Sequence, residues 1–273
     1  MIALSTPIIR FGFILAFCGQ LSAQVPDFRP LRTPQHIQEH NFAGIKKLAD
    51  AGVDVAQSSL GDFYATGTGV PKDYTEAANW YRKAAEQGLA SAQFNLGFMY
   101  ASGMGVTKSD DAEAVKWYLK AAEQGLDDAQ CNLGRMFYWG RGVPKDYAEA
   151  EKWYHKAAEQ GLASAQFNLA DLYAYGEYAH KDYVEALKWY RKAAEQGHIK
   201  AQSNLGAMYE FGLGVPKNYV EAYAWYNLAS VTNNKENGRD EIEKLMSPEE
   251  RKRAQRRSTE LYEEIAARKK TGK

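Results

Sequence analysis

The sequence predicts an all-α fold in which one helical unit of about 36 residues is repeated five times. Tryptophan recurs at intervals of 37, 36, 36 and 36 residues. A fixed period of this length is typical of arrays in which each unit buries its apolar face against its neighbours. The recurring residues are Trp80, Trp117, Trp153, Trp189 and Trp225, with Ala56, Ala92, Ala129, Ala165 and Ala201 and with Leu60, Leu96, Leu133, Leu169 and Leu205.

The first helix of each unit is predicted from residues such as Ala92, Leu96 and Tyr100. They fall at i, i+4 and i+8 and therefore share one helix face. Gly97 follows the leucine, and glycine recurs at this position, although a glycine inside a helix costs about 1 kcal/mol relative to alanine. We therefore expect a neighbouring helix to approach closely here. A stretch rich in glycine and proline, such as residues 67–71, then ends the helix and forms a loop.

The second helix of each unit is predicted to begin after Asp73. An aspartate followed three residues later by Glu76 is the pattern of a reciprocal capping box, in which each side chain bonds a free backbone amide. Ala77 and Trp80 begin the apolar face, and Gly88 ends the helix, where a left-handed residue is needed. The capping pair recurs as Asp110 with Glu113, Asp146 with Glu149, Asp182 with Glu185 and Asn218 with Glu221.

These motifs resemble the Sel1-like repeat, a longer-loop relative of the tetratricopeptide repeat. The matching pattern is Ala-x-x-x-Leu-Gly-x-x-Tyr-x-x-Gly-x-Gly-Val, followed by Glu-Ala-x-x-Trp-Tyr-x-x-Ala-Ala. The resemblance implies a right-handed α/α superhelix, or solenoid, whose first helices line a concave surface. The five expected repeats are residues 53–88, 89–125, 126–161, 162–197 and 198–232.

Unit four departs from the pattern in its loop. Ala170 follows the leucine in place of glycine, Tyr178 replaces the second loop glycine, and His180 replaces the proline. We expect an altered loop rather than a lost repeat.

Both ends of the array are predicted to carry helical caps. Residues 41–52 resemble the end of a second helix, and residues 24–40, with three prolines, should be extended or mobile. Residues 233–273 are expected to form a charged cap helix and tail, opening at Ser247 with proline in the first turn and running to about Arg268.

Residues 1–23 have the pattern of a secretory signal peptide. Arg10 precedes a short apolar run, and small residues precede a cleavage site after Ala23. The run is too short to span a bilayer, which disfavours a permanent membrane anchor. Lipid attachment at Cys18 is a further alternative, disfavoured by the bulky Phe17 before it. We therefore expect an exported protein, periplasmic or secreted.

Composition excludes some classes of partner and of stabilisation. The chain has 34 basic and 34 acidic residues, so no net charge attracts nucleic acid. After removal of the signal peptide Cys131 is the remaining cysteine, so an internal disulfide is not expected. We expect another protein or a peptide segment as partner and no cofactor. The sequence leaves the oligomeric state open.

Catalytic motifs have little support. His36 and His40 match the H-x-x-E-H pattern of some zinc proteases, but the segment lacks a surrounding domain and a third ligand. His155, His180 and His198 are isolated and are interpreted as surface residues. Some cysteine-rich relatives of the family are described as β-lactamases, which makes such a hydrolase the alternative function. The chain has no Ser-x-x-Lys motif to support it.

The best candidate for binding is an asparagine that recurs at one position of the first helices. An amide side chain has both a donor and an acceptor for a peptide backbone, and neighbouring helices about 9–10 Å apart match three extended residues. Four such positions would hold about nine residues. The alternative is that each asparagine bonds to the neighbouring repeat. The residues are Asn95, Asn132, Asn168 and Asn204.

Selectivity is expected from variable positions later in the same helices. One turn beyond the asparagine lie Asp62, Phe98, Arg135, Asp171 and Ala207; near the helix end lie Thr66, Ser102, Trp139, Tyr175 and Phe211. The aromatic residues would either contact a partner or pack beneath the following loop. The sequence thus favours a non-enzymatic scaffold that binds a polypeptide segment, with a purely structural spacer as a further alternative.

Overall fold

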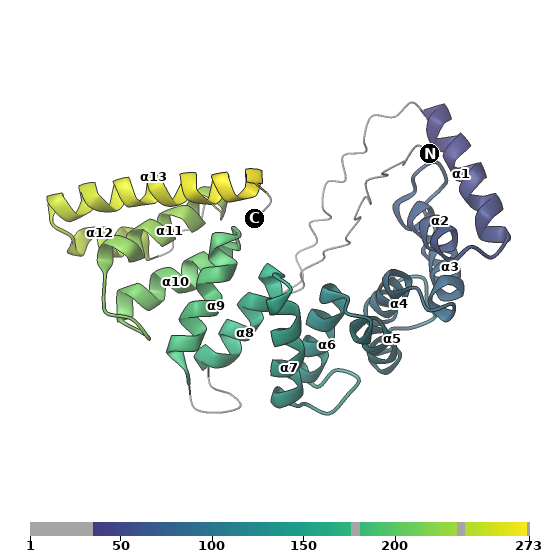
Figure 1. Ribbon diagram of the computed structural model, residues 1–273, viewed down its shortest axis with the longest axis horizontal. Helices are drawn as coiled ribbons and strands as arrows, with labels where there is room; N and C mark the ends of the chain where they lie inside the picture. Colours follow the sequence, from purple (N-terminus) through teal and green to yellow (C-terminus); the bar gives the residue numbers. More distant parts are fainter. Residues whose placement is uncertain (1–34, 176–180, 234–237, 272–273) are drawn as a thin grey trace, which may run out of the picture. The chain divides into compact units, whose positions relative to one another are not determined.

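The computed structural model describes residues 35–175, 181–233 and 238–271, and in these ranges it contains thirteen α-helices (Figure 1). The helices belong to one compact unit, Thr33–Lys273. The expected signal peptide, with Cys18, lies outside the described residues, as does most of the segment 24–40.

Five helix pairs follow one another along the chain and confirm the predicted repeat array. The first helices of the pairs are α2 (Asp54–Thr66), α4 (Ala90–Ser102), α6 (Asp127–Trp139), α8 (Ala163–Tyr175) and α10 (Ile199–Phe211). The second helices are α3 (Tyr74–Glu86), α5 (Asp111–Glu123), α7 (Tyr147–Glu159), α9 (Tyr183–Glu195) and α11 (Tyr219–Asn233). Each second helix packs against the first helix of its own repeat, and α3, α5, α7 and α9 also pack against the first helix of the next repeat. The described residues therefore form an α/α solenoid.

Tyrosines of the second helices explain the mid-helix glycines of the first helices. A Cβ added at Gly97 would lie 2.9 Å from the ring of Tyr118 and 3.2 Å from the carbonyl oxygen of Ala114. The equivalent pairs are Gly61 with Tyr81, Gly134 with Tyr154 and Gly206 with Tyr226. The expected close approach of a neighbouring helix is confirmed, and a ring packs on the glycine.

Loop glycines of repeats two, three and five lie against the backbone of the repeat before. Gly105 has φ +67°, and a Cβ there would lie 1.9 Å from the carbonyl oxygen of Tyr74 at the start of the preceding second helix. Gly142 is placed in the same way against Asp111, and Gly214 against Tyr183. A side chain at these positions would collide with backbone. The altered loop of repeat four, with Tyr178 and His180, lies outside the described residues.

Buried glutamines of the first helices form a series of hydrogen-bonded pairs with glutamines at the ends of the second helices, and we call this series the glutamine ladder. Gln93 of α4 is 4% exposed, and its Nε2 donates to the carbonyl oxygen of Ala85 at 3.1 Å. Its Oε1 accepts from Gln124 Nε2 at 2.8 Å, and Gln124 also donates to the carbonyl oxygen of Gly88. The same bonds recur for Gln57 with Gln87, Gln130 with Gln160 and Gln166 with Gln196. The ladder satisfies carbonyl groups at the ends of the second helices.

The second helices are capped differently from the reciprocal box that the sequence suggested. Asp110 accepts from the backbone N–H groups of Ala112 and Glu113, as expected. Its own N–H, however, donates to the carbonyl oxygen of Tyr100 in the preceding helix at 2.9 Å. Glu113 instead pairs with Lys116. Glu113 therefore forms an exposed ion pair, and the last turn of the preceding helix satisfies the Asp110 amide.

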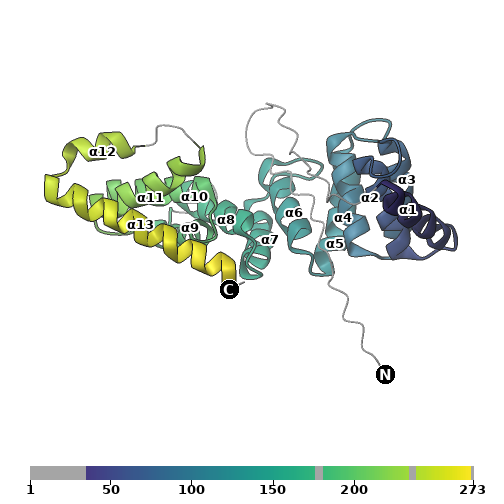
Figure 2. The same cartoon turned by 90° about the horizontal axis from the view of Figure 1, so that it is seen from above.

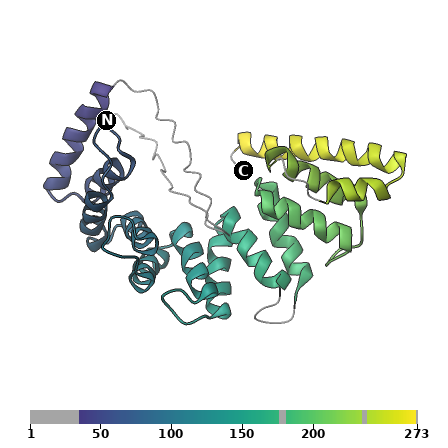
Figure 3. The same ribbon diagram turned by 180° about the vertical axis from the view of Figure 1, so that it is seen from behind.

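The ends of the array differ in detail from expectation. The N-terminal cap, α1 (Gln35–Asp50), packs on α2 and begins within the segment that we expected to be extended. At the other end a short helix, α12 (Arg239–Leu245), precedes the expected cap helix α13 (Pro248–Thr271). Figures 2 and 3 show α13 lying along α11, on the side of α11 away from α10. The capping box at the start of α13 is reciprocal, because Ser247 N–H donates to Glu250 and Glu250 N–H donates to Ser247.

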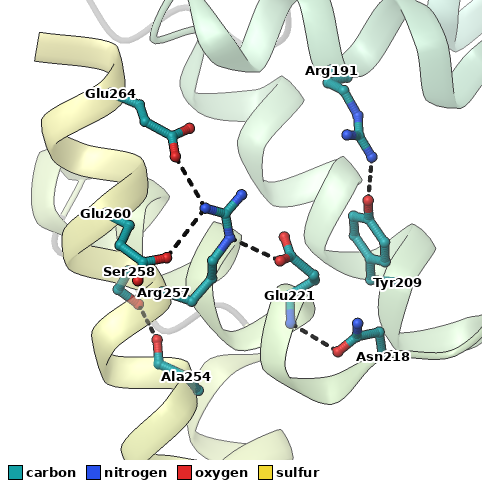
Figure 4. Close-up of polar contacts among 9 residues, drawn as sticks. All are labelled: Arg191, Tyr209, Asn218, Glu221, Ala254, Arg257, Ser258, Glu260 and Glu264. Carbon is teal, nitrogen blue, oxygen red and sulfur yellow. Dashed lines mark hydrogen bonds and ion pairs between the residues drawn. The ribbon is translucent and has the colours of Figure 1, made fainter. Parts of the chain in front are cut away.

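Helix α13 is held by apolar packing and by two arginines, of which Arg268 pairs with Glu195 of α9. Ala254, Leu261 and Ile265 are buried in the same cluster as Trp225 of α11. Arg257 of α13 points at Glu221 in the first turn of α11, with a distance of 2.8 Å, and also pairs with glutamates of its own helix (Figure 4). No helix in the described part of the chain is both long and apolar enough to cross a membrane.

Candidate binding surface on the first helices

The predicted site residues lie on one stripe of each first helix. In α6 the stripe contains Asn132, then Arg135 one turn later, and then Trp139 as the last residue. The spacing i, i+3, i+7 keeps these residues on one helix face. The flanking Leu133 and Met136 are buried instead. The stripe is thus less buried than the face of the first helix that carries Leu133 and Met136.

Two of the four asparagines bond to the preceding repeat. Asn168 Nδ2 lies 3.5 Å from Cys131 Sγ, and Asn204 Nδ2 donates to Asp171 Oδ1 at 3.3 Å. Asn132 instead accepts from Arg135 of its own helix at 3.5 Å. All four asparagines are half-buried. In repeats four and five the asparagines thus bond to the neighbouring repeat, which was the alternative to ligand binding. Each amide still has hydrogen-bonding groups that these contacts do not use.

Aspartates of the stripe are held by tyrosines of the second helices. Asp62 accepts a hydrogen bond from the Tyr81 hydroxyl at 2.6 Å, and Asp171 accepts from the Tyr190 hydroxyl and from Asn204. Burial raises the pKa of each aspartate to about 6. Phe98, Arg135 and Ala207, at the equivalent positions, are half-buried. The middle of the stripe is therefore partly engaged in packing between helices.

The aromatic residues at the ends of the first helices remain exposed. Trp139, Tyr175 and Phe211 are 60%, 58% and 59% exposed. Trp139 contacts Tyr138 edge to face, with ring centroids 4.8 Å apart. The exposure of Trp139 and Phe211 disfavours burial of these two rings beneath the following loop, which was one of the two alternatives from the sequence; the loop after Tyr175 lies outside the described residues. They are available to contact a partner.

The histidines do not form a metal site in the described residues, where no cluster of three or more metal-binding side chains occurs. His198, which we expected at the surface, is half-buried: it stacks on Phe167 and its Nδ1 accepts from Ala201 N–H. Burial lowers the pKa of His198 to about 4, so it is a neutral cap of α10. His155 lies beside Glu159 at 3.5 Å. The His36 and His40 side chains and all of His180 lie outside the described residues.

Cys131 is a buried thiol at the contact between α6 and α8. Its Sγ lies 3.8 Å from Ser164 Oγ, and burial raises its pKa to about 11. A protonated, buried thiol is a poor nucleophile, so Cys131 contributes packing and weak hydrogen bonds.

The sequence did not reveal the glutamine ladder. The pattern that could have predicted it is the glutamine that follows the recurring alanine in each first helix.

Comparison with known proteins agrees with the repeats seen in the structure. The Sel1 repeat model matches residues 54–89, 90–126, 127–162, 163–198 and 199–230. A Sel1 repeat protein from Oxalobacter formigenes has 36% identity and a TM-score of 0.66, over 75% of this chain and 59% of that one. A protective antigen of uropathogenic Escherichia coli strains has 32% identity and a TM-score of 0.54, over 85% and 59%.

The chain therefore aligns with about three fifths of the length of each of these two proteins. No curated protein matches the sequence. Five matched repeats, the helix pairs that they form and these structural relatives establish that the chain belongs to the Sel1 repeat family.

Proposed function

We propose that this protein is an exported adaptor that binds an extended polypeptide segment on its first helices. The observation that carries the proposal is a half-buried asparagine at one position of four successive first helices, beside a series of exposed aromatic rings. Repeats of this family typically mediate contacts between proteins. The equal numbers of basic and acidic residues favour a polypeptide over a nucleic acid as partner.

The spacing of the repeats supports an extended ligand. Side chains of successive first helices meet between α6 and α8 and between α8 and α10, and a step of about 9–10 Å from one repeat to the next would match three extended residues. One amide per repeat therefore meets every third residue of the ligand backbone. Such contacts hold the main chain in either direction, because an asparagine amide both donates and accepts. Side-chain preference then comes from the neighbouring variable positions.

The structure indicates which asparagines give the cleanest test. Asn168 and Asn204 bond to the preceding repeat, so their removal would confound binding with stability. Asn132 bonds within its own helix, and Asn95 occupies the same position in repeat two. The doubly substituted Asn95→Ala/Asn132→Ala protein is therefore the informative variant.

The experiment is selection of binders from a library of displayed random dodecapeptides, followed by affinity measurement with the double variant. We expect the affinity of selected peptides to fall about tenfold or more, because two backbone contacts are lost, while Tm changes by no more than about 2 °C. Asn79→Ala, at an exposed position of α3, is the control and should bind as the native protein does. Unchanged affinity in the double variant would contradict the proposal, as would a parallel collapse of Tm.

A further inference from the structure

Tyrosines at one position of the second helices carry hydroxyl groups that donate to carboxylates of the first helices. The three pairs, each within one repeat, are Tyr81 with Asp62, Tyr190 with Asp171 and Tyr226 with Glu210. A hydrogen bond to an ionised oxygen is stronger than one between neutral groups, and a half-buried carboxylate needs such donors. The fold thus repeatedly brings a carboxylate to this hydroxyl.

Repeat two has the tyrosine but lacks the carboxylate. Tyr118 occupies the position in α5, and Phe98 stands where repeats one and four have Asp62 and Asp171. Tyr118 is 2% exposed, and its hydroxyl has no hydrogen-bond partner among the described residues. The hydroxyl is not completely enclosed, because Trp225 Nε1 is the only fully enclosed side-chain polar atom without a partner in the described ranges. A ligand group can therefore reach the Tyr118 hydroxyl and satisfy it.

Repeat four shows which donors surround a carboxylate at this place. Asp171 Oδ1 accepts from the Tyr190 hydroxyl and, at 3.3 Å, from Asn204 Nδ2 of the next first helix. The corresponding donors in repeat two and the helix that follows it are Tyr118 and Asn132. The Nδ2 group of Asn132 donates to nothing within the described part of the chain. Both donors are thus present at the junction of repeats two and three, and their acceptor is missing.

The charges around this junction favour an anion. Arg135 lies one turn after Asn132 and donates to its Oδ1 at 3.5 Å. Burial raises the pKa of Tyr118, and the positive charges of Arg135 and Arg141 oppose that rise. Asp111, which pairs with Arg141, has the smaller opposite effect on the same hydroxyl. A negatively charged acceptor is therefore favoured here over a neutral carbonyl oxygen.

We propose that the junction of repeats two and three binds the carboxylate of an aspartate or glutamate side chain in the ligand segment. This carboxylate takes the place that Asp171 has in repeat four and accepts from Tyr118 Oη and Asn132 Nδ2. Phe98, which packs on the same apolar cluster as Tyr118, keeps water away and strengthens these bonds. A side chain suits the junction better than a chain end, because first helices continue on both sides of it. This inference rests on the proposed function and adds to it the chemistry of one ligand group.

Dodecapeptides selected from the random library on the native protein test the proposal. They should share an aspartate or glutamate at one internal position. Calorimetry should show that replacement of this residue by asparagine or glutamine weakens binding about tenfold or more, because a charge-assisted bond is lost. Amidation of the peptide C-terminus should leave the affinity unchanged, which distinguishes a side chain from a chain end.

Tyr118→Phe removes the hydroxyl and keeps the ring that covers Gly97. It should weaken the acidic peptide about tenfold and its amide analogue by less than about twofold, because only the carboxylate depends on that donor. Tm should change by no more than about 2 °C, since the hydroxyl has no partner within the described protein. Tyr81→Phe is the matched control, because the Tyr81 hydroxyl already donates to Asp62. It should lower Tm and leave both affinities unchanged.

Phe98→Asp supplies the missing carboxylate from the protein itself. Phe98→Asn is its control, because it loses the same ring packing and introduces no charge. The aspartate variant should bind the acidic peptide at least about tenfold more weakly than the asparagine variant, since two carboxylates then compete for one set of donors.

The outcomes separate this inference from the proposed function. Binders without a shared acidic residue overturn the carboxylate proposal, as does an equal effect of Tyr118→Phe on the acidic peptide and its amide analogue. Loss of binding on amidation of the C-terminus also overturns it, because the bound group is then a chain end. If such binders still require Asn95 and Asn132, the adaptor function stands without the carboxylate site. Failure to select any peptide contradicts both.

Discussion

Tyr118 disfavours a side chain on the residue that it covers in the preceding helix. A Cβ added at Gly97 would lie 2.9 Å from the Tyr118 ring and 3.2 Å from the carbonyl oxygen of Ala114. Repeat four has Ala170 at the equivalent position, and both Ala170 and Tyr190 are buried there. The fold therefore holds a methyl group in repeat four, whereas in repeat two the ring would have to shift to admit one.

Gly97→Ala should therefore destabilise the protein by about 1–2 kcal/mol, because the overpacking outweighs the helix propensity that alanine adds. The measurement is urea unfolding. Gly44→Ala is the control: nothing lies within 4 Å of the added Cβ in α1, so the same change should be neutral or slightly stabilising. Equal effects at the two sites would contradict the packing explanation.

The partly buried carboxyl group of Asp62 should make the free energy of unfolding depend on pH. Burial raises its folded-state pKa from 3.8 to about 6. The folded state thus holds its proton more tightly, and the resulting stabilisation is complete below pH 3.8 and lost as the pH rises through 6. Asp62→Asn keeps an acceptor for Tyr81 and carries no charge. It should be more stable than the native protein at pH 7.5, by about 1 kcal/mol after allowance for partial exposure.

Denaturant unfolding at pH 7.5 and at pH 4 measures this difference. The gain should shrink towards zero at pH 4, where the native carboxyl is itself protonated in the folded protein. A gain of the same size at both pH values would show that the cause is packing rather than ionisation.

At the scale of helices and loops, the sequence predicted the positions of the repeated helices correctly. It predicted the hydrogen-bond partners of the repeated residues less well. Periodicity revealed the helix pairs because each pair must bury one apolar face. It did not reveal that the Asp110 amide bonds to Tyr100 and not to Glu113, since both arrangements fit the same sequence pattern. The glutamine ladder was missed because a polar residue beside an alanine resembles a surface residue until the partner across the repeat is known.

The hydrogen bonds of the glutamine ladder should contribute measurably to the stability of the array. Gln130→Leu should cost about 1 kcal/mol, because it removes one of the two hydrogen bonds that the Ala122 carbonyl oxygen accepts and one of the two that the Gln160 amide donates. The double substitution with Gln160→Leu should cost less than the sum of the two single ones, since the two residues share a bond. Thermal or urea unfolding of the three variants measures the coupling, and strict additivity would rule out the bond as its source.

At the scale of the whole array, stability depends on each repeat having a neighbour. Helix α13 supplies that neighbour for α11, with Leu261 and Ile265 buried against the last repeat. The predicted caps agree with this role at both ends, although α12 and the first residues of α1 were not expected. Short helices without strong apolar periodicity give little signal in a sequence.

Removal of residues 247–273 should unfold the array from its C-terminal end. The apolar face of α11, including Trp225, would then be exposed to water, while the first repeats would keep all their contacts. Hydrogen exchange should show lost protection in α10 and α11 and unchanged protection in α2 to α5. Arg257→Ala, which removes the ion pair but not the packing, should produce a much smaller effect. Uniform loss of protection along the chain would contradict a nearest-neighbour array.

The regular step of the glutamine bonds has a consequence for how such chains change in length. Excising residues 127–162, one complete matched unit, brings Ala122 and Gly125 to the places of Ala158 and Gly161, where they meet Gln166 and Gln196. Every bond in the series is thereby restored without any other substitution. Duplication of the same stretch adds one more module that forms the same bonds with its two neighbours. Gain and loss of units by recombination therefore cost this architecture little, and its reach along a partner is adjustable one module at a time.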